Sequence, residues 1–297
     1  MDSRLHFSPF SATLHGKRVN FQRPVIMGIL NATPDSFYDG GRYTSPDTIL
    51  AHARQLLADG ADIIDLGVVS SRPGAQLLEP EEEAERLVPL VRLLRQELPC
   101  ETIISVDTCY SLPATKAAEA GADIINDISG GQFDPQMFSS VASLRLPYIL
   151  MHTRGLPNVM QESYNTQYNN ILDVLSDYFQ SKLEKLDNLG VQDVWLDPGF
   201  GFAKTTDQNY HLLLHLDQLI ARFPFYPMLT ALSNKSMITS RLASSQGTPD
   251  QYFPLPDSEF GTLVLNTLAL RAGTRLLRVH TPRLAKVAIN LLFPDSN

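Results

Sequence analysis

Polar side chains that could bind a ligand recur in this sequence directly after short apolar runs. They are Asn31, Asp65, Asp107, Asn126, His152, Asp197, Ser233 with Lys235, and Arg278 with His280. Carboxylates and amides could hydrogen-bond a polar ligand, and the cationic groups could hold an anion. A single polar residue in such a place is usually a turn former or a helix cap. Eight runs out of eight are hard to attribute to capping alone, so we predict that these side chains share one site.

The apolar runs themselves predict a set of strands. They lie at residues 25–30, 63–67, 103–107, 124–128, 148–152, 194–199, 228–233 and 276–280. Most are continuous rather than alternating and rich in β-branched residues, which is typical of strands buried on both faces. Their mean spacing of about 36 residues suits a strand, a helix and two loops.

The intervals have the pattern of amphipathic helices. Ser45-Pro46 supplies a cap and a first-turn proline, apolar residues follow at helical spacing from 49 to 57, and Gly60 ends the run. Further helices are predicted at 81–98, at 171–189 and from Thr281-Pro282 onward. Eight such units predict an α/β fold, a (β/α)8 TIM barrel, whose strands all end at one mouth. An open doubly wound sheet would more often carry a glycine fingerprint after its first strand.

The remaining segments fit a single domain over residues 1–297. Residues 5–22 read as two short strands around His15-Gly16-Lys17. We expect 1–24 to form an N-terminal β-hairpin closing the barrel bottom, and 25–293 to form the barrel. Residues 244–258 are rich in Pro, Ser and Gly, which predicts a loop within the domain.

The composition argues against some classes of protein. Of the 297 residues 43% are hydrophobic, and the net charge of −8 argues against a nucleic-acid partner, although a local basic pocket stays open. Cys100 and Cys109 lack metal-ligand spacing, and so few cysteines suggest a reducing compartment. The sequence shows no signal-peptide core and no apolar run near the ~20 residues of a membrane span. We expect a cytoplasmic protein without a membrane partner.

Eight short motifs occur in the order and spacing of one enzyme family. They are GILNATPDSFYDGG, SSRPGA, SVDT, INDISGG, LMH, LDPGFGF, LSNKSM and LRVH, between Val25 and His280. In these motifs the chain resembles dihydropteroate synthase. The resemblance implies a TIM barrel that joins p-aminobenzoate to 6-hydroxymethyl-7,8-dihydropterin pyrophosphate with Mg²⁺. The products would be 7,8-dihydropteroate and pyrophosphate, in folate biosynthesis. It also implies a dissociative mechanism, a homodimer and a target of sulfonamides, which mimic p-aminobenzoate; how strongly this chain responds to them stays open.

The resemblance also assigns roles to residues. The pterin would be bound by Asp107, Asn126, Met151, Asp197, Phe202 and Lys235. The pyrophosphate would be bound by Asn31, Ser71, Arg278 and His280, with Asn31 also on the metal. The p-aminobenzoate would be bound by Phe37, Arg72, Pro73, Ser233 and Lys235. The catalytic groups would be Asp35, Asp107, Lys235, Arg278 and His280.

Two loops would act as lids over this mouth. Residues 33–41, with Gly40-Gly41 as a hinge, would bring Asp35 and Phe37 over the reacting centre and exclude water. The SSRPGA loop would be the second lid, beside the p-aminobenzoate ring.

The chain departs from the family pattern at five positions. They are Val68 and Val69 for a glycine and a glutamate, Ala203 for glycine, Asn234 for arginine and Thr281 for aspartate. Asn cannot make the charge-assisted bond of an arginine, whereas Thr281 is expected to cap its helix still. Because most changes touch the p-aminobenzoate side and the lids, we expect an active enzyme with altered p-aminobenzoate and sulfonamide binding. The alternatives are a non-catalytic pterin-binding paralogue and a pterin-dependent methyl-transfer barrel.

Overall fold

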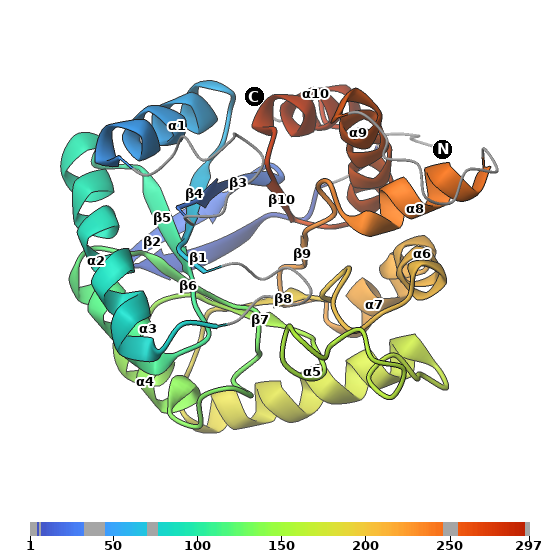
Figure 1. Cartoon of the computed structure of the whole chain (residues 1–297), viewed down its shortest axis with the longest axis horizontal. Helices are drawn as coiled ribbons and strands as arrows, with labels where there is room; N and C mark the ends of the chain where they lie inside the picture. Colours follow the sequence, from blue (N-terminus) through green and yellow to red (C-terminus); the bar gives the residue numbers. More distant parts are fainter. Residues whose placement is uncertain (1–4, 6, 33–44, 70–76, 246–254, 295–297) are drawn as a thin grey trace.

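Eight parallel strands form the centre of the computed structural model, which describes residues 5, 7–32, 45–69, 77–245 and 255–294 (Figure 1). They are β3 (Val25–Asn31), β4 (Ile63–Gly67), β5 (Ile103–Asp107), β6 (Ile124–Asp127), β7 (Tyr148–Met151), β8 (Val194–Asp197), β9 (Leu229–Thr230) and β10 (Leu276–Val279). Their order is β8-β7-β6-β5-β4-β3-β10-β9. A parallel bridge between Leu196 and Met228 joins β8 to β9 and closes the circle. The predicted barrel is therefore confirmed, although β9 is shorter than its apolar run.

Helices surround the barrel (Figure 1). They are α1 (Pro46–Ala58), α2 (Pro80–Glu97), α3 (Ser111–Glu119), α4 (Met137–Leu144), α5 (Ile171–Asn188), α6 (Thr206–Leu214), α7 (Leu216–Arg222), α8 (Ser236–Ser245), α9 (Leu255–Ala272) and α10 (Pro282–Leu292). The Ser45 side chain accepts from the Thr48 N–H and caps α1 as predicted. None of the helices in the described ranges combines the length and apolar character that crossing a membrane requires.

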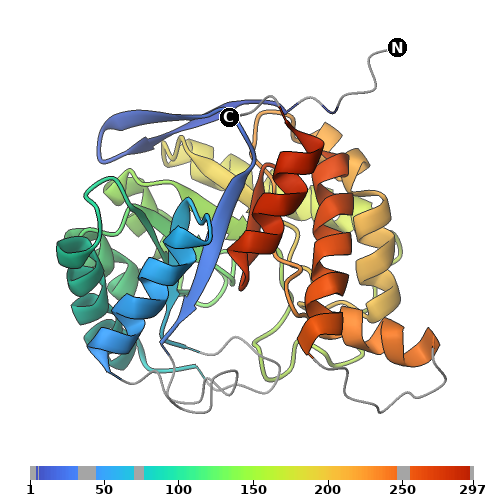
Figure 2. The same cartoon turned by 90° about the horizontal axis from the view of Figure 1, so that it is seen from above.

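The N-terminal hairpin closes the barrel at the amino ends of the strands. Strands β1 (Phe10–Leu14) and β2 (Lys17–Phe21) pair antiparallel and lie across one end of the barrel (Figure 2). Ala12 and Leu14 join a core cluster with residues of the barrel strands, among them Trp195. The rings of Phe10 and Phe21 meet Trp195 edge-on at centroid distances of 5.7 and 6.2 Å. The barrel interior is thus filled at this end, and the other end is left for chemistry.

Two local predictions are wrong. Part of the stretch predicted as a loop is helical, because α8 reaches Ser245 and α9 begins at Leu255. Pro256 falls in the first turn of α9, where no intrahelical N–H is required, so proline composition misled the prediction. Thr281 precedes α10 without a side-chain cap. Its hydroxyl donates instead to Glu259 Oε1 of α9, at 3.0 Å.

Candidate active site

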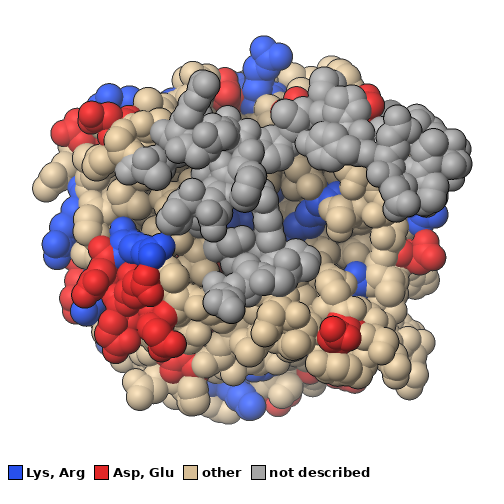
Figure 3. Space-filling view, viewed as in Figure 1, with Lys and Arg blue, Asp and Glu red and all other residues tan. Residues whose placement is uncertain are grey.

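The strand register brings the polar strand ends together. Asn31 lies opposite Gly67, Gly67 opposite Asp107, and Asp107 opposite Asn126. On the next strands Met151 lies opposite Asp197. Because parallel strands in a barrel all point the same way, these residues reach one mouth. Basic side chains are visible in the hollow at the centre of this face, in a chain whose net charge is negative (Figure 3).

Arg278 is the centre of the network in this mouth. Its Nε donates to Asp65 Oδ2 at 2.6 Å, and its Nη2 donates to Asp107 Oδ2 at 2.8 Å. Asn126 Nδ2 donates to the same Asp65 oxygen at 3.1 Å. Four strands thus each contribute one side chain to a single charge-assisted network. The network fixes the position of every group in it.

Asp65 has a role that the sequence interpretation missed. It was counted among the polar strand ends but assigned no function. The structure buries it completely and places it between Arg278 and Asn126. A carboxylate only accepts hydrogen bonds, so the Asn126 amide must direct its NH₂ group at Asp65. The Asn126 Oδ1 is then left to accept a hydrogen bond from elsewhere. A buried aspartate within an apolar strand was the available signal.

A second group lies where β8 and β9 end. The Lys235 Nζ contacts the Phe200 carbonyl oxygen and lies 4.9 Å from the centroid of the Phe202 ring. Asp197 Oδ1 accepts the Gly199 N–H at 2.7 Å. Gly199 has φ +68, and a Cβ there would lie 2.0 Å from the His152 carbonyl oxygen, so only glycine fits this turn. The turn holds Asp197, Phe202 and Lys235 at one side of the mouth.

Burial shifts the ionisation of these groups. It raises the pKa of Asp107 to about 7, with Arg278 opposing the shift. It also raises the pKa of Asp197, with Lys235 opposing. Burial lowers the pKa of Lys235 to about 8. For Arg278 burial lowers the pKa, but Asp65 and Asp107 outweigh it and the net shift is upward. The carboxyls are therefore poised to gain from a ligand that donates hydrogen bonds.

Ser233 and His280 form a pair at the ends of β9 and β10. The His280 Nδ1 lies 3.1 Å from Ser233 Oγ, and the His280 backbone N–H donates to the same hydroxyl at 3.2 Å. Asn31 is exposed at the end of β3. Met151 is buried, and its Cγ is 3.4 Å from where a Gly199 Cβ would lie. Asn31 lies next to the central network, because Gly67 is opposite both Asn31 and Asp107 in the strand register.

The departures from the family pattern are structurally explained in part. Asn234 has φ +55, a left-handed conformation that Asn tolerates better than most residues. Its Oδ1 accepts from Ser258 Oγ of α9 at 3.2 Å, and its N–H donates to Thr262 Oγ1 at 3.0 Å. The amide is thus tied to α9. Ala203 also has a positive φ, of +50, at a cost of about 1 kcal/mol relative to glycine. Val68 is buried in the core between barrel and helices.

Five predicted site residues lie outside the described residues. They are Asp35, Phe37, Ser71, Arg72 and Pro73, and both predicted lids lie there with them. Of the other predicted site residues, Asp107, Asn126 and Arg278 share the central network. Asp197, Phe202 and Lys235 form the second group.

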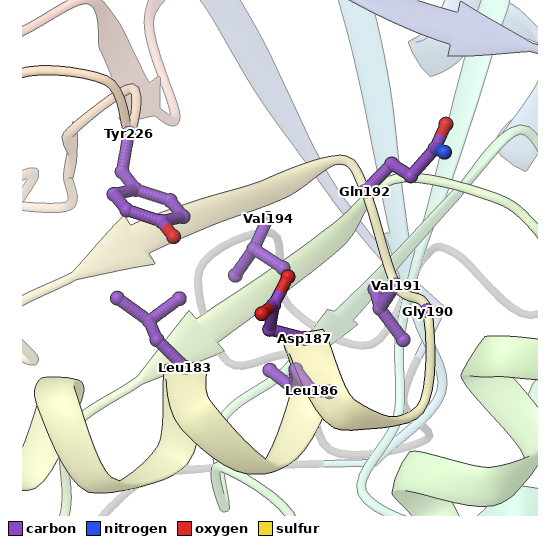
Figure 4. Close-up of a pocket in the computed structure, with 8 residues that line it drawn as sticks. All are labelled: Leu183, Leu186, Asp187, Gly190, Val191, Gln192, Val194 and Tyr226. Atoms are coloured by element: carbon purple, nitrogen blue, oxygen red, sulfur yellow. The ribbon is translucent and has the colours of Figure 1, made fainter.

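A cavity of about 320 Å³ lies elsewhere in the molecule (Figure 4). It is lined by the end of α5 and the start of β8, with Leu183, Leu186, Val194 and Tyr226 among its walls. This is the amino end of β8, opposite the mouth. Asp187 is the one titratable group besides Tyr226 among its described lining residues. The grouping of carboxylates and cations therefore favours the mouth as the site.

Known proteins share this chain's sequence over most of its length. Residues 27–280 match the family described as "Pterin binding enzyme". The dihydropteroate synthase of a Synechocystis species is 40% identical over 261 residues, which are 87% of this chain and 86% of that protein. The mitochondrial folate synthesis bifunctional protein of Arabidopsis thaliana is 36% identical over 87% of this chain and 47% of its own length.

Solved structures agree with the sequence comparison. The dihydropteroate synthase of Yersinia pestis with a sulfonamide drug superimposes with a TM-score of 0.85 at 35% identity, covering 95% of this chain and 98% of that one. The Xanthomonas albilineans dihydropteroate synthase with 4-aminobenzoic acid gives a TM-score of 0.80 at 32% identity, covering 95% and 96%. The likeness extends along both chains, including the strands that carry the mouth.

Proposed function

The chain belongs to the dihydropteroate synthase family of pterin-binding enzymes, and we propose that the mouth of its barrel carries out that family's condensation. The protein is a transferase that condenses 6-hydroxymethyl-7,8-dihydropterin pyrophosphate with p-aminobenzoate to 7,8-dihydropteroate and pyrophosphate, in folate biosynthesis. One observation carries the assignment to this mouth. It is the network that joins Asp65, Asp107, Asn126 and Arg278.

The pterin ring fits the polar floor of the mouth. Its edge alternates N–H donors with acceptors, and Asp107 and Asp197 offer carboxylate oxygens to the donors. Asn126 adds an acceptor, because its NH₂ group is held by Asp65. Lys235 supplies a donor, while Phe202 and Met151 form apolar walls. Binding would provide the buried carboxyls with hydrogen bonds that favour their charged forms, which lowers the cost of burying them.

The pyrophosphate is assigned to the side of Arg278 and His280, with Asn31 and Ser71. A guanidinium has five N–H donors, and the bonds to Asp65 and Asp107 use two of them. When the C–O bond to the leaving group breaks, negative charge develops on the bridging oxygen. Arg278 and His280 would stabilise this charge, and the fixed position of Arg278 means that little reorganisation is needed.

Among its described residues, the mouth fits Mg²⁺ as an ion shared with the substrate. Asn31 offers an amide oxygen, and a Cβ at Gly67 would lie 3.8 Å from its Oδ1 and 3.5 Å from the Asp107 Cβ, so the glycine leaves space between them. Among the described residues no group of three His, Cys, Asp or Glu side chains could hold a metal. Mg²⁺ keeps several waters and often binds substrate phosphates, which suits a single protein ligand. When bound, it would neutralise charge on the leaving group.

The second substrate needs positioning more than activation. In a dissociative reaction pyrophosphate leaves first, and the pterin cation is captured by an amine that is already nucleophilic. The C–N bond forms and the amine loses a proton, so no strong base is required. We assign p-aminobenzoate to Ser233 and Lys235, with Phe37, Arg72 and Pro73, and stabilisation of the cation to Asp35 with the strand carboxylates.

The protein is also proposed to form a homodimer. Four large apolar side chains are exposed on the adjacent helices α9 and α10, at i, i+4 spacing on each: Phe260, Val264, Val287 and Leu291. Leu291 is 77% exposed. Such a patch is typical of a surface covered by a partner. Sedimentation should show a dimer that Leu291→Glu converts to a monomer; a monomeric wild-type protein would refute the dimer.

The reaction itself is tested by following two products at once. Pyrophosphate and dihydropteroate are measured from the pterin pyrophosphate and Mg²⁺, with and without p-aminobenzoate. Equal amounts of both products support the synthase. A bound pterin without dihydropteroate would instead identify a non-catalytic paralogue, and methyl transfer would release no pyrophosphate.

We also propose a cytoplasmic location, which fits the two free cysteines, Cys100 and Cys109.

A further inference from the structure

The turn that follows β8 is held almost entirely by side chains. Each carbonyl oxygen from Gly199 to Thr205 accepts a hydrogen bond from a side chain. The donors are Lys204 for residues 199 and 202, Lys235 for 200, Gln161 for 201, Tyr168 for 203, and Asn209 for 204 and 205. A segment with no regular secondary structure is thereby given one conformation.

Lys204 is the most buried of these donors. Its side chain is 2% exposed, and its Nζ lies 3.0 Å from each of three acceptors. They are the Gly199 oxygen, the Phe202 oxygen and the His152 Nδ1. An ammonium group has three N–H donors, so each has a partner. Lysines are almost never fully buried unless they are paired, which indicates that this one has a specific task.

His152 completes the arrangement from the end of β7. Its ring is 1% exposed and meets the Tyr178 ring edge-on at 4.8 Å. We assign Lys204 as the donor to Nδ1, which corresponds to a neutral ring with its proton on Nε2. Burial, with help from the Lys204 charge, lowers the pKa of His152 well below its usual value, which agrees with a neutral ring.

The turn positions three groups of the pterin site. Asp197 precedes it and bonds to the Gly199 N–H, Phe202 lies within it, and Lys235 binds the Phe200 oxygen. Lys204 ties the two ends of this short segment together through residues 199 and 202. A shift of the turn would therefore move Asp197, Phe202 and Lys235 together, which are an acceptor, an apolar wall and a donor of the pterin site.

Lys204 also acts on a neighbouring carboxyl. Together with Lys235 and Arg278 it opposes the upward shift that burial causes in the pKa of Asp197. Burial lowers the pKa of Lys204 well below its usual value; Asp197 from β8 opposes this shift, while Lys235 after β9 and Arg154 after β7 add to it. The groups that face Lys204 are thus Asp197, Lys235, Arg154 and the neutral His152.

We propose that Lys204 is a positioning residue for the pterin substrate, acting with His152 through the 199–205 turn. It touches no reacting atom. It sets the placement of Asp197, Phe202 and Lys235 through its bonds to the Gly199 and Phe202 oxygens. This inference rests on the proposed function of the mouth.

The test is Lys204→Met, which keeps the length of the side chain and removes its charge and donors. We expect the KM for the pterin pyrophosphate to rise about tenfold and the KM for p-aminobenzoate to change by less than about twofold. The acid limb of kcat/KM for the pterin should move upward, because Lys204 is one of the groups that hold the pKa of Asp197 down. Lys116→Met, on the exposed side of α3, is the matched control and should change none of these values.

Three outcomes would overturn the inference. They are an unchanged pterin KM and pH profile in folded Lys204→Met, an equal loss for both substrates, and a His152 that is charged at pH 6 by ¹⁵N NMR. If Lys204→Met does not fold, His152→Phe keeps the ring packing and removes one acceptor, and a pterin KM raised about threefold is expected. Wild-type protein without synthase activity would refute the proposed function instead. Binding of 6-hydroxymethylpterin to the wild-type protein and to each variant distinguishes failure of the positioning role from failure of the proposed function.

Discussion

Two sides of the mouth are built by different kinds of hydrogen bond. On the pterin side, Arg278 joins Asp65 and Asp107 by charge-assisted bonds of 2.6 and 2.8 Å between strands. At the corner between β9 and α8, Asn234 bonds to Ser258 and Thr262 by neutral contacts of 3.0 to 3.4 Å. The first kind is roughly twice as strong as the second.

The difference indicates which side tolerates change. On the pterin side every member of the network is a partner of another, so one replacement leaves a buried charge without compensation. At the β9–α8 corner the bonds are neutral and end on helix α9, which can adjust. Asn234, the departure from the family pattern, lies at this corner, and the strand carboxylates match the pattern.

Arg278→Met should have the largest effect on stability and activity, because Arg278 is the centre of the network on the pterin side. It leaves Asp65 and Asp107 buried beside each other without a cation, which costs about 3–5 kcal/mol of unfolding free energy. Urea denaturation measures this loss, and synthase activity should fall below detection. Arg241→Met is the control, because its ion pair with Asp207 is exposed and contributes at most about 1 kcal/mol. Equal losses for the two variants would contradict the contrast.

The pterin side should also be the source of pH-dependent stability. Glu83 of α2 is buried near Asp107, and burial raises its pKa to about 7, with a Thr108 hydrogen bond opposing. A raised folded-state pKa gives stability that is complete below pH 4.5 and is lost as pH rises to about 7. At about 1.4 kcal/mol per pKa unit, this loss is on the order of 3 kcal/mol.

Glu83→Gln should remove that part of the pH dependence. The variant is neutral at every pH, so at pH 8 it should be more stable than the wild-type protein. Asp107, whose pKa is also raised to about 7, remains and leaves a residual decline. Urea midpoints between pH 4 and 8 test this, and parallel curves for the two proteins would refute the assignment to Glu83.

Asp65→Asn tests whether the central network contributes to pterin binding. The new amide keeps its oxygen toward Arg278 and Asn126, which both donate to that position, but it removes the negative charge that holds Arg278 and buries an NH₂ group where Oδ1 has no partner among the described residues. We expect the pterin KM to rise roughly tenfold to a hundredfold, with p-aminobenzoate binding little changed. No change in pterin KM would remove Asp65 from the site.

The sequence predicted the framework better than the contacts. Continuous apolar runs are typical of strands buried on both faces, so most barrel strands were predicted to within a residue or two, and β9, with two residues of a predicted 228–233, is the exception. The pairing of Asp65 with Arg278 was not predictable, because 213 residues separate them and only closure of the barrel brings them together. Thr281 failed as a cap for a similar reason: Glu259 of α9 competes for its hydroxyl. Rules that consider only neighbouring residues cannot predict hydrogen bonds to partners from distant parts of the chain.

Asn234→Arg should have the smallest effect, and it tests the β9–α8 corner directly. Arginine cannot keep the bonds to Ser258 and Thr262 in the same way, so its side chain is released from α9 and adds a cation near Ser233 and Lys235. The p-aminobenzoate KM and the sulfonamide inhibition constant should each change about threefold, under 1 kcal/mol, with the pterin KM constant. Asn234→Gly accepts the positive φ without adding charge and should leave the inhibition constant unchanged. If Asn234→Arg also leaves the inhibition constant unchanged, Asn234 does not determine how the enzyme binds sulfonamides.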